Sequence, residues 1–277
     1  MERGGTLATT CARARRYALL TKYGGSGLKV SIITAVRNGV AAITPTLRSV
    51  REQNFPNVEH IVIDGASTDG TLEILEQEER HIAFLRSGRD LGVYDAFNKG
   101  LLLATGDVVA YLNAGDTYAS RYVVAEVVQR LERSDADALF GDVAITRDIG
   151  GPTIRRYRSS KFSPERIARG FMPAHPAQFI RRRVYDRYGT YNASYMIAGD
   201  FEFIARAFRR GGASYEYLPE ILTAMPVGGL SSRGWRSYLT ITREMTRACK
   251  ANGIRTNSLL LLARLPMKYF NEVLRRS

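Results

Sequence analysis

Residues 58–71 read VEHIVIDGASTDGT, an apolar run that ends on Asp64 and gives way to small and polar residues. Residues 108–116, VVAYLNAGD, show the same pattern and end on Asp116. Short apolar runs bounded by turn residues are typical of buried strands in a parallel sheet. Open α/β sheets bind their ligands at the carboxyl ends of such strands, so both aspartates are expected at a ligand-binding edge.

The two carboxylates indicate the chemistry of that edge. Carboxylates that lie together can hold a divalent cation, and the cation can in turn hold a phosphate. The chain as a whole carries a net charge of +13. An acidic site at the sheet edge of so basic a chain therefore suggests metal and nucleotide chemistry.

Length and composition narrow the class of protein. A chain of 277 residues fits one large α/β domain or one and a half smaller ones. Its 45% of hydrophobic residues exclude global disorder. Cys11 and Cys249 make neither a disulfide framework nor a metal cluster. We expect two free structural thiols in a reducing compartment.

The positive charge is concentrated toward the two ends. Residues 1–27 carry five Lys/Arg against one Glu (+4), residues 231–277 carry ten against two (+8), and residues 28–230 carry 25 against 24 (+1). A nucleic-acid-binding domain more often has a basic face on its folded core, so no nucleic-acid partner is expected. Basic flanks on a near-neutral body favour an anionic membrane surface.

The sequence suggests neither a signal peptide nor a membrane span. The longest apolar stretch near the C-terminus, 259–263, is interrupted by Arg264 and Pro266, far short of the roughly 20 residues a span needs. We expect a cytoplasmic protein, peripheral at the inner face of the cell membrane. The basic and apolar residues of 259–275 are compatible with two roles, membrane contact or packing of a helix on the core.

Strands and helices are expected to alternate from residue 29, which predicts a mostly parallel sheet with right-handed crossovers. The expected strands are 30–34, one ending at 64, 82–85 and one ending at 112, and the helices between them begin near 45, 69 and 93. Beyond residue 141 the pattern changes to a hairpin about Gly150-Gly151 and a helix over 200–210.

Polar residues after the predicted strands are the candidates for ligand contact. Asp64 precedes its turn and is expected to bind a ligand, whereas Asp69 is expected to cap the next helix. Asp90 lies in a loop before a helix, and Lys99 in that helix could reach a phosphate. A capped helix with solvated polar residues explains this last segment as well.

Three further residues could carry chemistry. Asp116 could donate a hard oxygen to Mg²⁺ or Mn²⁺, or cap a helix. Asp200 opens a predicted helix, where it could cap or take a proton from a substrate hydroxyl. His175 lies in a loop between two prolines whose rigid backbone would aim its ring, although a lone histidine is more often a structural hydrogen-bonder.

Taken in order, these segments resemble a family 2 glycosyltransferase with the GT-A fold, over about residues 29–230. The matching segments are VSIIT at 30–34 with Asn38, DGASTDGT at 64–71, Asp90 with GVYDAFNKG at 92–100, NAGD at 113–116, and GD at 199–200. The segment at 94–100 is similar to that of bacterial members that make exopolysaccharide, lipopolysaccharide or glycolipid sugars.

The resemblance implies an architecture for the whole chain. A basic extension (1–27) would precede the GT-A domain (28–230), and a helical, basic segment (231–277) would follow it. Within the domain, the nucleotide-binding half (28–116) would hold a mostly parallel sheet flanked by helices. The acceptor half (117–230) would be mixed.

The resemblance also implies roles for individual residues. Asp116 matches the last carboxylate of an Asp-x-Asp motif that binds Mn²⁺ or Mg²⁺, and Asp200 matches the catalytic base. Thr34 and Asp64 would contact the base and ribose of the donor. The implied donor-binding set is Thr34, Asn38, Asp64, Asp90, Asn98 and Lys99. Candidates for acceptor or phosphate contact are His175 and, in a GGLS segment similar to Gly-Gly-x-Ser, Gly229 and Ser231.

The implied reaction is an inverting transfer from a nucleotide-diphosphate sugar to a saccharide or lipid-linked saccharide acceptor. One departure concerns the metal, because family members commonly have an acidic residue where this chain has Asn113 or Gly115. The count of carboxylates around the ion is therefore low, which predicts weak metal affinity.

Three other functions are alternatives to glycosyl transfer. A sugar nucleotidyltransferase needs a glycine-rich, basic loop after the first strand, and residues 34–39, TAVRNG, are too poor in glycine. A dinucleotide-binding oxidoreductase is disfavoured because no Gly-x-Gly-x-x-Gly follows an early strand. A non-catalytic binder of membrane or nucleic acid, driven by the basic flanks, would show salt-dependent binding without binding nucleotide-sugars.

Overall fold

The computed structural model describes residues 27–228 and 234–262, with positions 234–236 and 259 described by their backbone alone. In this part of the chain nine strands form one mixed sheet, in the order β3-β2-β1-β4-β8-β6-β9-β5 with β7 beside β6. The strands are β1 (Val30–Val36), β2 (Val58–Asp64), β3 (Phe84–Ser87), β4 (Val108–Tyr111), β5 (Thr117–Tyr118), β6 (Ala138–Thr146), β7 (Thr153–Tyr157), β8 (Gln178–Arg181) and β9 (Tyr215–Pro226).

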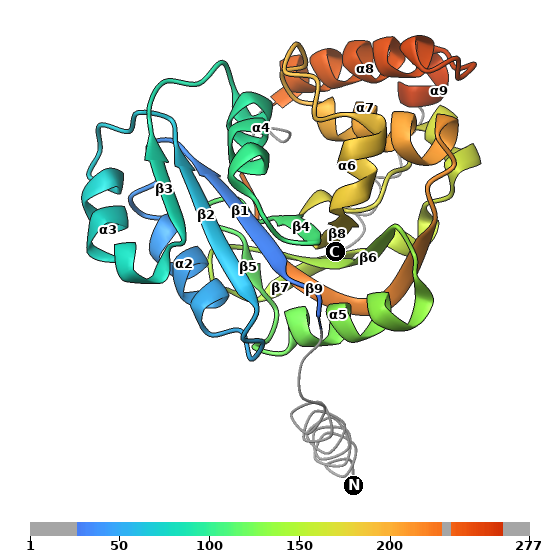
Figure 1. The fold of residues 1–277 in the computed structure, drawn as a ribbon. Helices are drawn as coiled ribbons and strands as arrows, with labels where there is room; N and C mark the ends of the chain where they lie inside the picture. The colour runs from blue at the N-terminus through green and yellow to red at the C-terminus, as the bar shows by residue number, and fades with distance from the viewer. Residues whose placement is uncertain (1–26, 229–233, 263–277) are drawn as a thin grey trace, which may run out of the picture.

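Helices connect the strands and cover both faces of the sheet (Figure 1). The α-helices are α2 (Ile43–Arg51), α3 (Thr71–Gln77), α4 (Val93–Leu103), α5 (Val123–Ser134), α6 (Arg182–Tyr188), α7 (Gly199–Ile204), α8 (Gly234–Ala251) and α9 (Ser258–Leu262). The short helices are the 3-10 turns η1 (Glu79–His81), η2 (Ser159–Lys161), η3 (Pro164–Arg169) and η4 (His175–Ala177), and the π-helical turn η5 (Ala205–Arg210).

The first four strands confirm the predicted parallel sheet. β1 pairs in parallel with β2 and β4, and β2 pairs in parallel with β3. The register places Val36 opposite Asp64 and Asp64 opposite Ser87, so these three strands end in one row. Any side chain in the loops that follow is therefore held at one edge of the sheet.

Alternating side chains bind the sheet to its two helical layers, as the period of a strand requires. Ile33 and Ile61 pack with Phe97 of α4 in one core cluster, whereas Ile32 of the same strand packs with Val124 of α5 on the other face. Figure 1 shows α4 on one side of these strands and α2 and α5 on the other, so apolar packing fixes the sheet on both faces.

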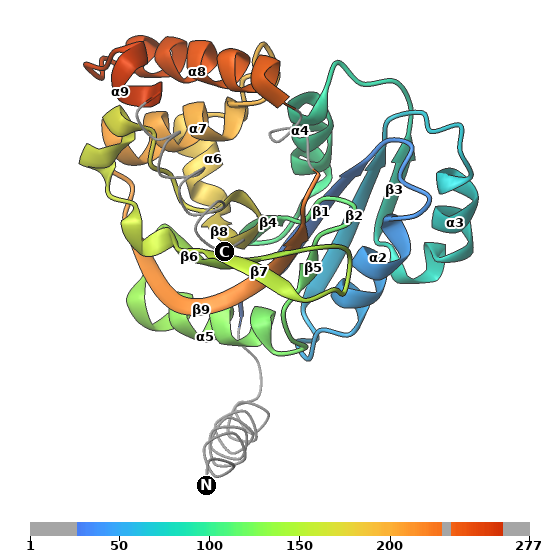
Figure 2. The ribbon, with the colours of Figure 1, turned by 180° about the vertical axis from the view of Figure 1, so that it is seen from behind.

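The second half of the sheet is mixed, in agreement with the implied GT-A fold. β8 pairs antiparallel with β4 and β6, whereas β6 and β9 run parallel. β6 and β7 form the hairpin expected about Gly150-Gly151. Figure 2 shows α6, α7 and α8 on the side of the sheet that carries α4, with α5 on the opposite side.

Two elements differ from their predicted limits. The third strand was expected at 82–85 but occupies 84–87, because η1 takes up 79–81 and Ile82 packs its side chain against Val62 and Leu75. The helix expected over 200–210 begins at Gly199 and changes to the π-helical turn η5 at Ala205.

The C-terminal helices contribute to the core. Met245, Ala248 and Cys249 of α8 and Leu261 of α9 are buried in the cluster that also holds Phe201. Within the stretch 259–275, for which two roles were expected, the described Leu261 packs on the core, while residues 263–277 lie outside the described chain. Cys249 is free and Cys11 lies outside the described residues. None of the described helices combines the length and the apolarity needed to cross a membrane.

Candidate functional site

Asp64 is the last residue of β2 and is fully buried. One of its carboxylate oxygens accepts hydrogen bonds, and the other has no hydrogen-bond partner in the described chain. Its Oδ2 accepts hydrogen bonds from the Ser87 hydroxyl at 2.6 Å and the Ser67 amide at 3.1 Å. No group in the described chain donates to Oδ1, although this oxygen is buried. Buried polar atoms are rarely left without a partner, so Oδ1 is available to a donor group of a ligand.

The loops after β1 and β2 are tied together beside Asp64. The Asn38 backbone amide donates to the Ser67 hydroxyl at 2.8 Å, and the side-chain Oδ1 of Asn38 accepts the Thr68 backbone amide at 2.9 Å. Asp69 accepts the amides of Val40 at 3.1 Å and of Thr71, the first residue of α3, at 3.1 Å. Asp69 was expected to cap α3, but Gly70 holds the N-cap position, and Asp69 binds the first amide of the helix from one residue further out. Asn38 shapes the edge of the site.

Asp90 lies across the end of β2, close to Gly65. A Cβ atom at Gly65 would come within 2.5 Å of Asp90 Oδ2, so only glycine admits this approach. Asp90 Oδ1 accepts the Gly92 amide at 3.0 Å, which holds the carboxylate at the start of α4. The structure therefore brings Asp90 to the same edge as Asp64.

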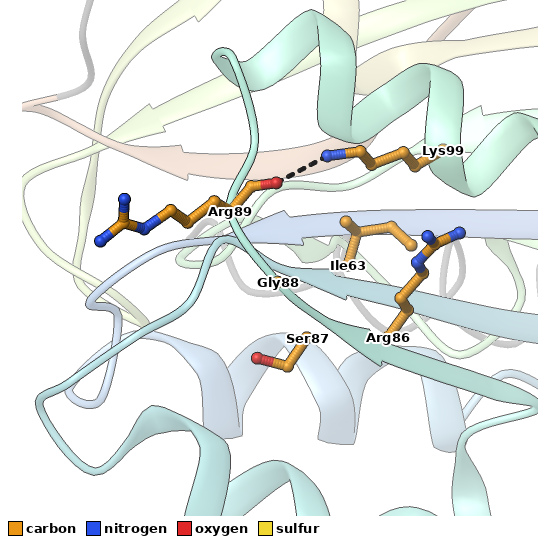
Figure 3. A pocket seen from close by; sticks show the side chains of 6 residues that line it. All are labelled: Ile63, Arg86, Ser87, Gly88, Arg89 and Lys99. Carbon is orange, nitrogen blue, oxygen red and sulfur yellow. Dashed lines mark hydrogen bonds between the residues drawn. The ribbon is translucent and has the colours of Figure 1, made fainter.

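A small cleft opens where β3 meets α4, with positive charge on its lining (Figure 3). It is lined by Ile63, Arg86, Ser87, Gly88, Arg89 and Lys99. Lys99 Nζ donates to the Arg89 carbonyl at 2.9 Å and pairs with Asp95 at 2.8 Å. Ser87 lines this cleft and also binds Asp64 Oδ2, so the cleft and the Asp64 carboxylate adjoin the same end of β3.

The turn that carries Asp116 is organised by a buried threonine of α2. The Thr46 hydroxyl accepts the Gly115 amide at 2.9 Å and donates to the Asp116 carbonyl at 2.8 Å. Asp116 itself is buried, and burial raises the pKa of its carboxyl to about 8. No cationic side chain of the described residues offsets that shift. A carboxylate desolvated in this way would be stabilised by a cation.

The donor set of this turn fits a hard divalent ion that also holds phosphate oxygens. Asn113 Oδ1 is buried without a hydrogen-bond partner in the described chain, so this turn has an unused amide oxygen besides the Asp116 carboxylate. In residues 27–228 and 234–262, no three or more His, Cys, Asp or Glu side chains lie together in a group that could hold a metal ion. Mg²⁺ sites of one or two carboxylates are completed by water and substrate phosphates.

Asp200 lies at the start of α7, facing Tyr94 of α4. Its Oδ1 accepts the Phe201 amide at 2.8 Å and lies 3.1 Å from the Tyr94 hydroxyl. The Asp200 side chain is half-buried, and the Tyr94 side chain is buried. Burial, together with the Asp200 charge, raises the pKa of Tyr94 well above its usual value. Tyr94 therefore stays protonated, and its one hydroxyl hydrogen faces two acceptors, the Ile197 carbonyl and Asp200 Oδ1.

His175 lies in an aromatic cluster near Asp200. Its ring stacks on Phe97 with 5.3 Å between centroids, and Nε2 lies 3.4 Å from the Tyr191 hydroxyl. Burial lowers the pKa of His175, while the Asp200 charge acts in the opposite direction. The structure thus places a buried imidazole within electrostatic reach of the expected catalytic carboxylate, and burial favours its neutral form.

Two predicted donor contacts have their side chains engaged elsewhere. The buried Thr34 hydroxyl donates to the Leu112 carbonyl at 2.8 Å and lies 2.9 Å from His60 Nε2. The Asn98 side chain donates to the Tyr191 carbonyl at 2.8 Å and accepts the Tyr191 amide at 3.0 Å. Neither side chain is brought together with Asp64. Gly229 and Ser231 lie outside the described residues.

Ser87 and Thr46 are site residues that the sequence analysis did not name. Ser87 is the third member of the row formed with Val36 and Asp64, and an expected strand end at residue 85 concealed it. Thr46 lies one position after Pro45, inside a helix, and nothing local connects it to a turn near residue 115. Only the sheet register and the helix packing reveal these two contacts.

Comparison with known proteins places the chain in a family. A sequence model described as glycosyl transferase family 2 matches residues 31–208, well over half of the chain. The chain belongs to glycosyltransferase family 2. The matched range contains every described site residue discussed above and ends within the π-helical turn after α7.

Relatives of this family 2 glycosyltransferase occur in mycobacteria. An uncharacterized glycosyltransferase of Mycobacterium tuberculosis is 33% identical over 180 residues, covering 64% of this chain and 68% of the relative. A PGL/p-HBAD biosynthesis glycosyltransferase of Mycobacterium bovis is 30% identical over 207 residues, covering 73% of this chain and 78% of the relative.

Solved structures confirm the GT-A fold of the glycosyltransferase. Residues 1–349 of Staphylococcus aureus TarS, in complex with UDP-GlcNAc, align with a TM-score of 0.64 and 17% identity over 86% of this chain and 72% of that one. The mannosyltransferase PcManGT of Pyrobaculum calidifontis, in complex with GDP-Man and Mn²⁺, aligns with a TM-score of 0.60 and 18% identity over 96% of this chain and 79% of that one.

Proposed function

We propose that this glycosyltransferase moves a sugar from a nucleotide-diphosphate sugar to a hydroxyl of a saccharide or lipid-linked saccharide, with inversion at the anomeric carbon. The product would be a bacterial exopolysaccharide, lipopolysaccharide or glycolipid. The biosynthetic role printed for the mycobacterial relative supports a glycolipid product. The nucleotide-sugars held by two structural neighbours support the class of donor.

The free oxygen of Asp64 carries the proposal for the donor. A buried carboxylate oxygen without a hydrogen bond is costly, and a ligand N–H or O–H would satisfy it. The uracil or guanine ring and the ribose of a nucleotide both present such donors. The neighbouring cleft with Arg86, Arg89 and Lys99 supplies positive charge for the diphosphate.

Asp116 is proposed to hold Mn²⁺ or Mg²⁺ beneath the diphosphate, with the Asn113 amide oxygen as a further donor. The ion would supply charge stabilisation for the departing nucleoside diphosphate. Thr46 would keep the turn in the shape that presents Asp116, through its bonds to Gly115 and the Asp116 carbonyl.

Asp200 is proposed as the general base. It would accept the proton of the acceptor hydroxyl as that oxygen bonds to the anomeric carbon and the bond to the diphosphate breaks. Tyr94 would hold the loop before Asp200 through the hydrogen bond from its hydroxyl to the Ile197 carbonyl, and that hydroxyl lies 3.1 Å from Asp200 Oδ1. One displacement of this kind inverts the anomeric centre.

The acceptor side rests on fewer observations. His175 lies near Asp200 and stays a candidate for acceptor contact, as do Gly229 and Ser231 outside the described residues. The basic flanks support a peripheral position on an anionic membrane, where a lipid-linked acceptor would be found. Liposome co-sedimentation of the full chain and of a chain ending at residue 255 tests that location.

Two measurements test the proposed reaction. A thermal-shift screen of UDP, GDP and dTDP, with and without Mn²⁺, should show one preferred base and a larger shift with the ion. Asp200→Asn should lower transfer by about 10²–10⁴-fold and leave donor binding unchanged. Asp186→Asn, at an exposed aspartate of α6, is the matched control. Full transfer by Asp200→Asn would remove Asp200 as the base.

A further inference from the structure

We propose that Glu244 of α8 is a positioning residue for Asp200, so that the C-terminal helix is part of the catalytic machinery. This inference rests on the proposed role of Asp200 as the base. Residues 231–277 hold ten basic residues and only two acidic ones, Glu244 and Glu272. One of these two rare carboxylates is directed at the loop that carries the proposed base.

Glu244 binds three consecutive backbone amides of that loop. Its Oε1 accepts the Met196 amide at 2.7 Å, and its Oε2 accepts the amides of Ile197 at 2.9 Å and Ala198 at 2.8 Å. Successive amides that point in one direction form a concave anion site, and here a carboxylate from α8 fills it. Hydrogen bonds to an ionised acceptor are stronger than neutral ones, so this contact fixes the backbone two residues before Asp200.

The same loop is held from the opposite side by Tyr94. The amide of Ile197 is bound by Glu244, and the carbonyl of Ile197 is bound by the Tyr94 hydroxyl. That hydroxyl also lies 3.1 Å from Asp200 Oδ1. Gly199 permits this approach, because a Cβ there would come within 2.8 Å of the Tyr94 ring. Residue 197 is therefore clamped between α8 and α4, and a shift of the clamp would displace Asp200.

Further contacts hold α8 in place over the loop. The Arg247 guanidinium lies 3.8 Å from the centroid of the Tyr195 ring and donates to the Ser194 carbonyl at 3.0 Å. Asn252, near the end of α8, donates to Glu202 of α7 at 3.3 Å. These contacts fix the helix on both the loop and α7, so Glu244 has a rigid support.

A residue that acts through the base should affect the chemical step and spare donor binding. Glu244→Gln keeps the shape of the side chain but turns one acceptor oxygen into an amide donor that opposes the loop amides. We expect kcat to fall at least tenfold, because displacement of a reacting group by an ångström costs that much or more. The Kd of the preferred nucleoside diphosphate should stay within twofold. The matched control is Glu216→Gln. Glu216 lies on β9 and pairs with Arg130 of α5, and this variant should keep full activity.

A double variant separates positioning from a general structural defect. If Glu244 acts through Asp200, adding Glu244→Gln to Asp200→Asn should lower the residual transfer no further. If Glu244→Gln instead caused a general structural defect, transfer by the double variant would fall by the product of the two single-variant losses. Multiplied losses, or unchanged kcat in Glu244→Gln, would overturn the proposal, while the strong loss of transfer in Asp200→Asn would still support the proposed base. Full activity of Asp200→Asn would instead contradict the proposed base.

Folding of the variants is checked by circular dichroism and thermal melting. Should Glu244→Gln not fold, Glu244→Asp provides the second test, since it keeps the charge but withdraws the carboxylate by one methylene. We expect Glu244→Asp to fold, to bind nucleoside diphosphate normally and to lose several-fold in kcat. Wild-type kcat in Glu244→Asp would contradict the proposed positioning role.

Discussion

Ser87 donates its hydroxyl hydrogen to Asp64 Oδ2 at 2.6 Å and so joins the ends of two parallel strands. With the Ser67 amide on the same oxygen, Oδ2 is satisfied and Oδ1 is left for a ligand. The serine therefore decides which oxygen of the aspartate is free. Two variants measure the value of this arrangement.

Asp64→Asn should weaken binding of the preferred nucleoside diphosphate by about tenfold or more, because one acceptor oxygen is replaced by an amide donor. Ser87→Ala should weaken it by about threefold to tenfold, since the carboxylate loses one of the bonds that orient it. Isothermal titration calorimetry measures both. Ser120→Ala, at an exposed serine before α5, is the control, and equal affinities in all four proteins would refute a donor role for Asp64.

The pKa of Asp116 predicts how metal binding depends on pH. Burial raises this pKa to about 8, so the ion-free carboxyl is largely protonated at pH 7 and must lose its proton to bind an ion. In the presence of nucleoside diphosphate, Mn²⁺ affinity should rise by up to tenfold per pH unit from pH 6 to about 8 and level off above it. A flat profile over pH 6–8 would show that Asp116 does not titrate with the ion.

The same shift predicts an effect on stability without metal. Because the folded pKa of Asp116 lies above its value of about 4 in the unfolded chain, the folded state binds the extra proton. This group therefore lowers the free energy of unfolding as the pH rises from about 4 to about 8, by up to ~1.4 kcal/mol per unit. Asp116→Asn should make the metal-free protein more stable at pH 8 in urea unfolding, and Asp186→Asn should not.

Asn98 should matter for stability more than for donor binding. Its two bonds to the Tyr191 backbone join α4 to the loop before α7, so Asn98→Ala should lower the free energy of unfolding by about 1–3 kcal/mol. Nucleoside diphosphate affinity should change less than twofold. Asn192→Ala, at an exposed position in the same loop, is the control. If Asn98→Ala lost affinity for nucleoside diphosphate but kept its free energy of unfolding, the donor contact that the resemblance implied for Asn98 would be supported.

The cationic cleft predicts a salt-dependent contribution to donor binding. Arg86→Gln and Arg89→Gln should each weaken nucleoside diphosphate binding by about threefold to tenfold at low salt, and less at high salt, because exposed charges are screened. Arg48→Gln, at an exposed arginine of α2, serves as the comparison. Binding that is insensitive to both cleft substitutions at low salt would place the diphosphate elsewhere.

Much of the donor side was predictable because its signals are local. Asp64 and Asp116 follow apolar runs, and a buried strand places its next turn at the sheet edge whatever the rest of the chain does. Asp69 binds the amide of Thr71 at the start of α3 two residues on, and Asp90 binds the amide of Gly92 two residues on. Contacts of this range depend on spacing, which the sequence states directly.

Other parts could not be predicted, because their partners are distant in the chain. Asn98 binds the Tyr191 backbone, Thr34 binds the Leu112 carbonyl, and Thr46 shapes a turn 69 residues away. Each of these side chains is polar and well placed on its own element. Which partner it meets depends on how the helices pack on the sheet.

The sequence by itself determined the strand ends, the order of the motifs and the family they resemble, since strand period and turn chemistry are encoded over a few residues. Only the tertiary structure decided that Oδ1 of Asp64 is free, and that Glu244 of α8 binds the loop before Asp200. Both depend on elements that meet across the fold, where burial and hydrogen-bond geometry select one partner among many of the same chemical type.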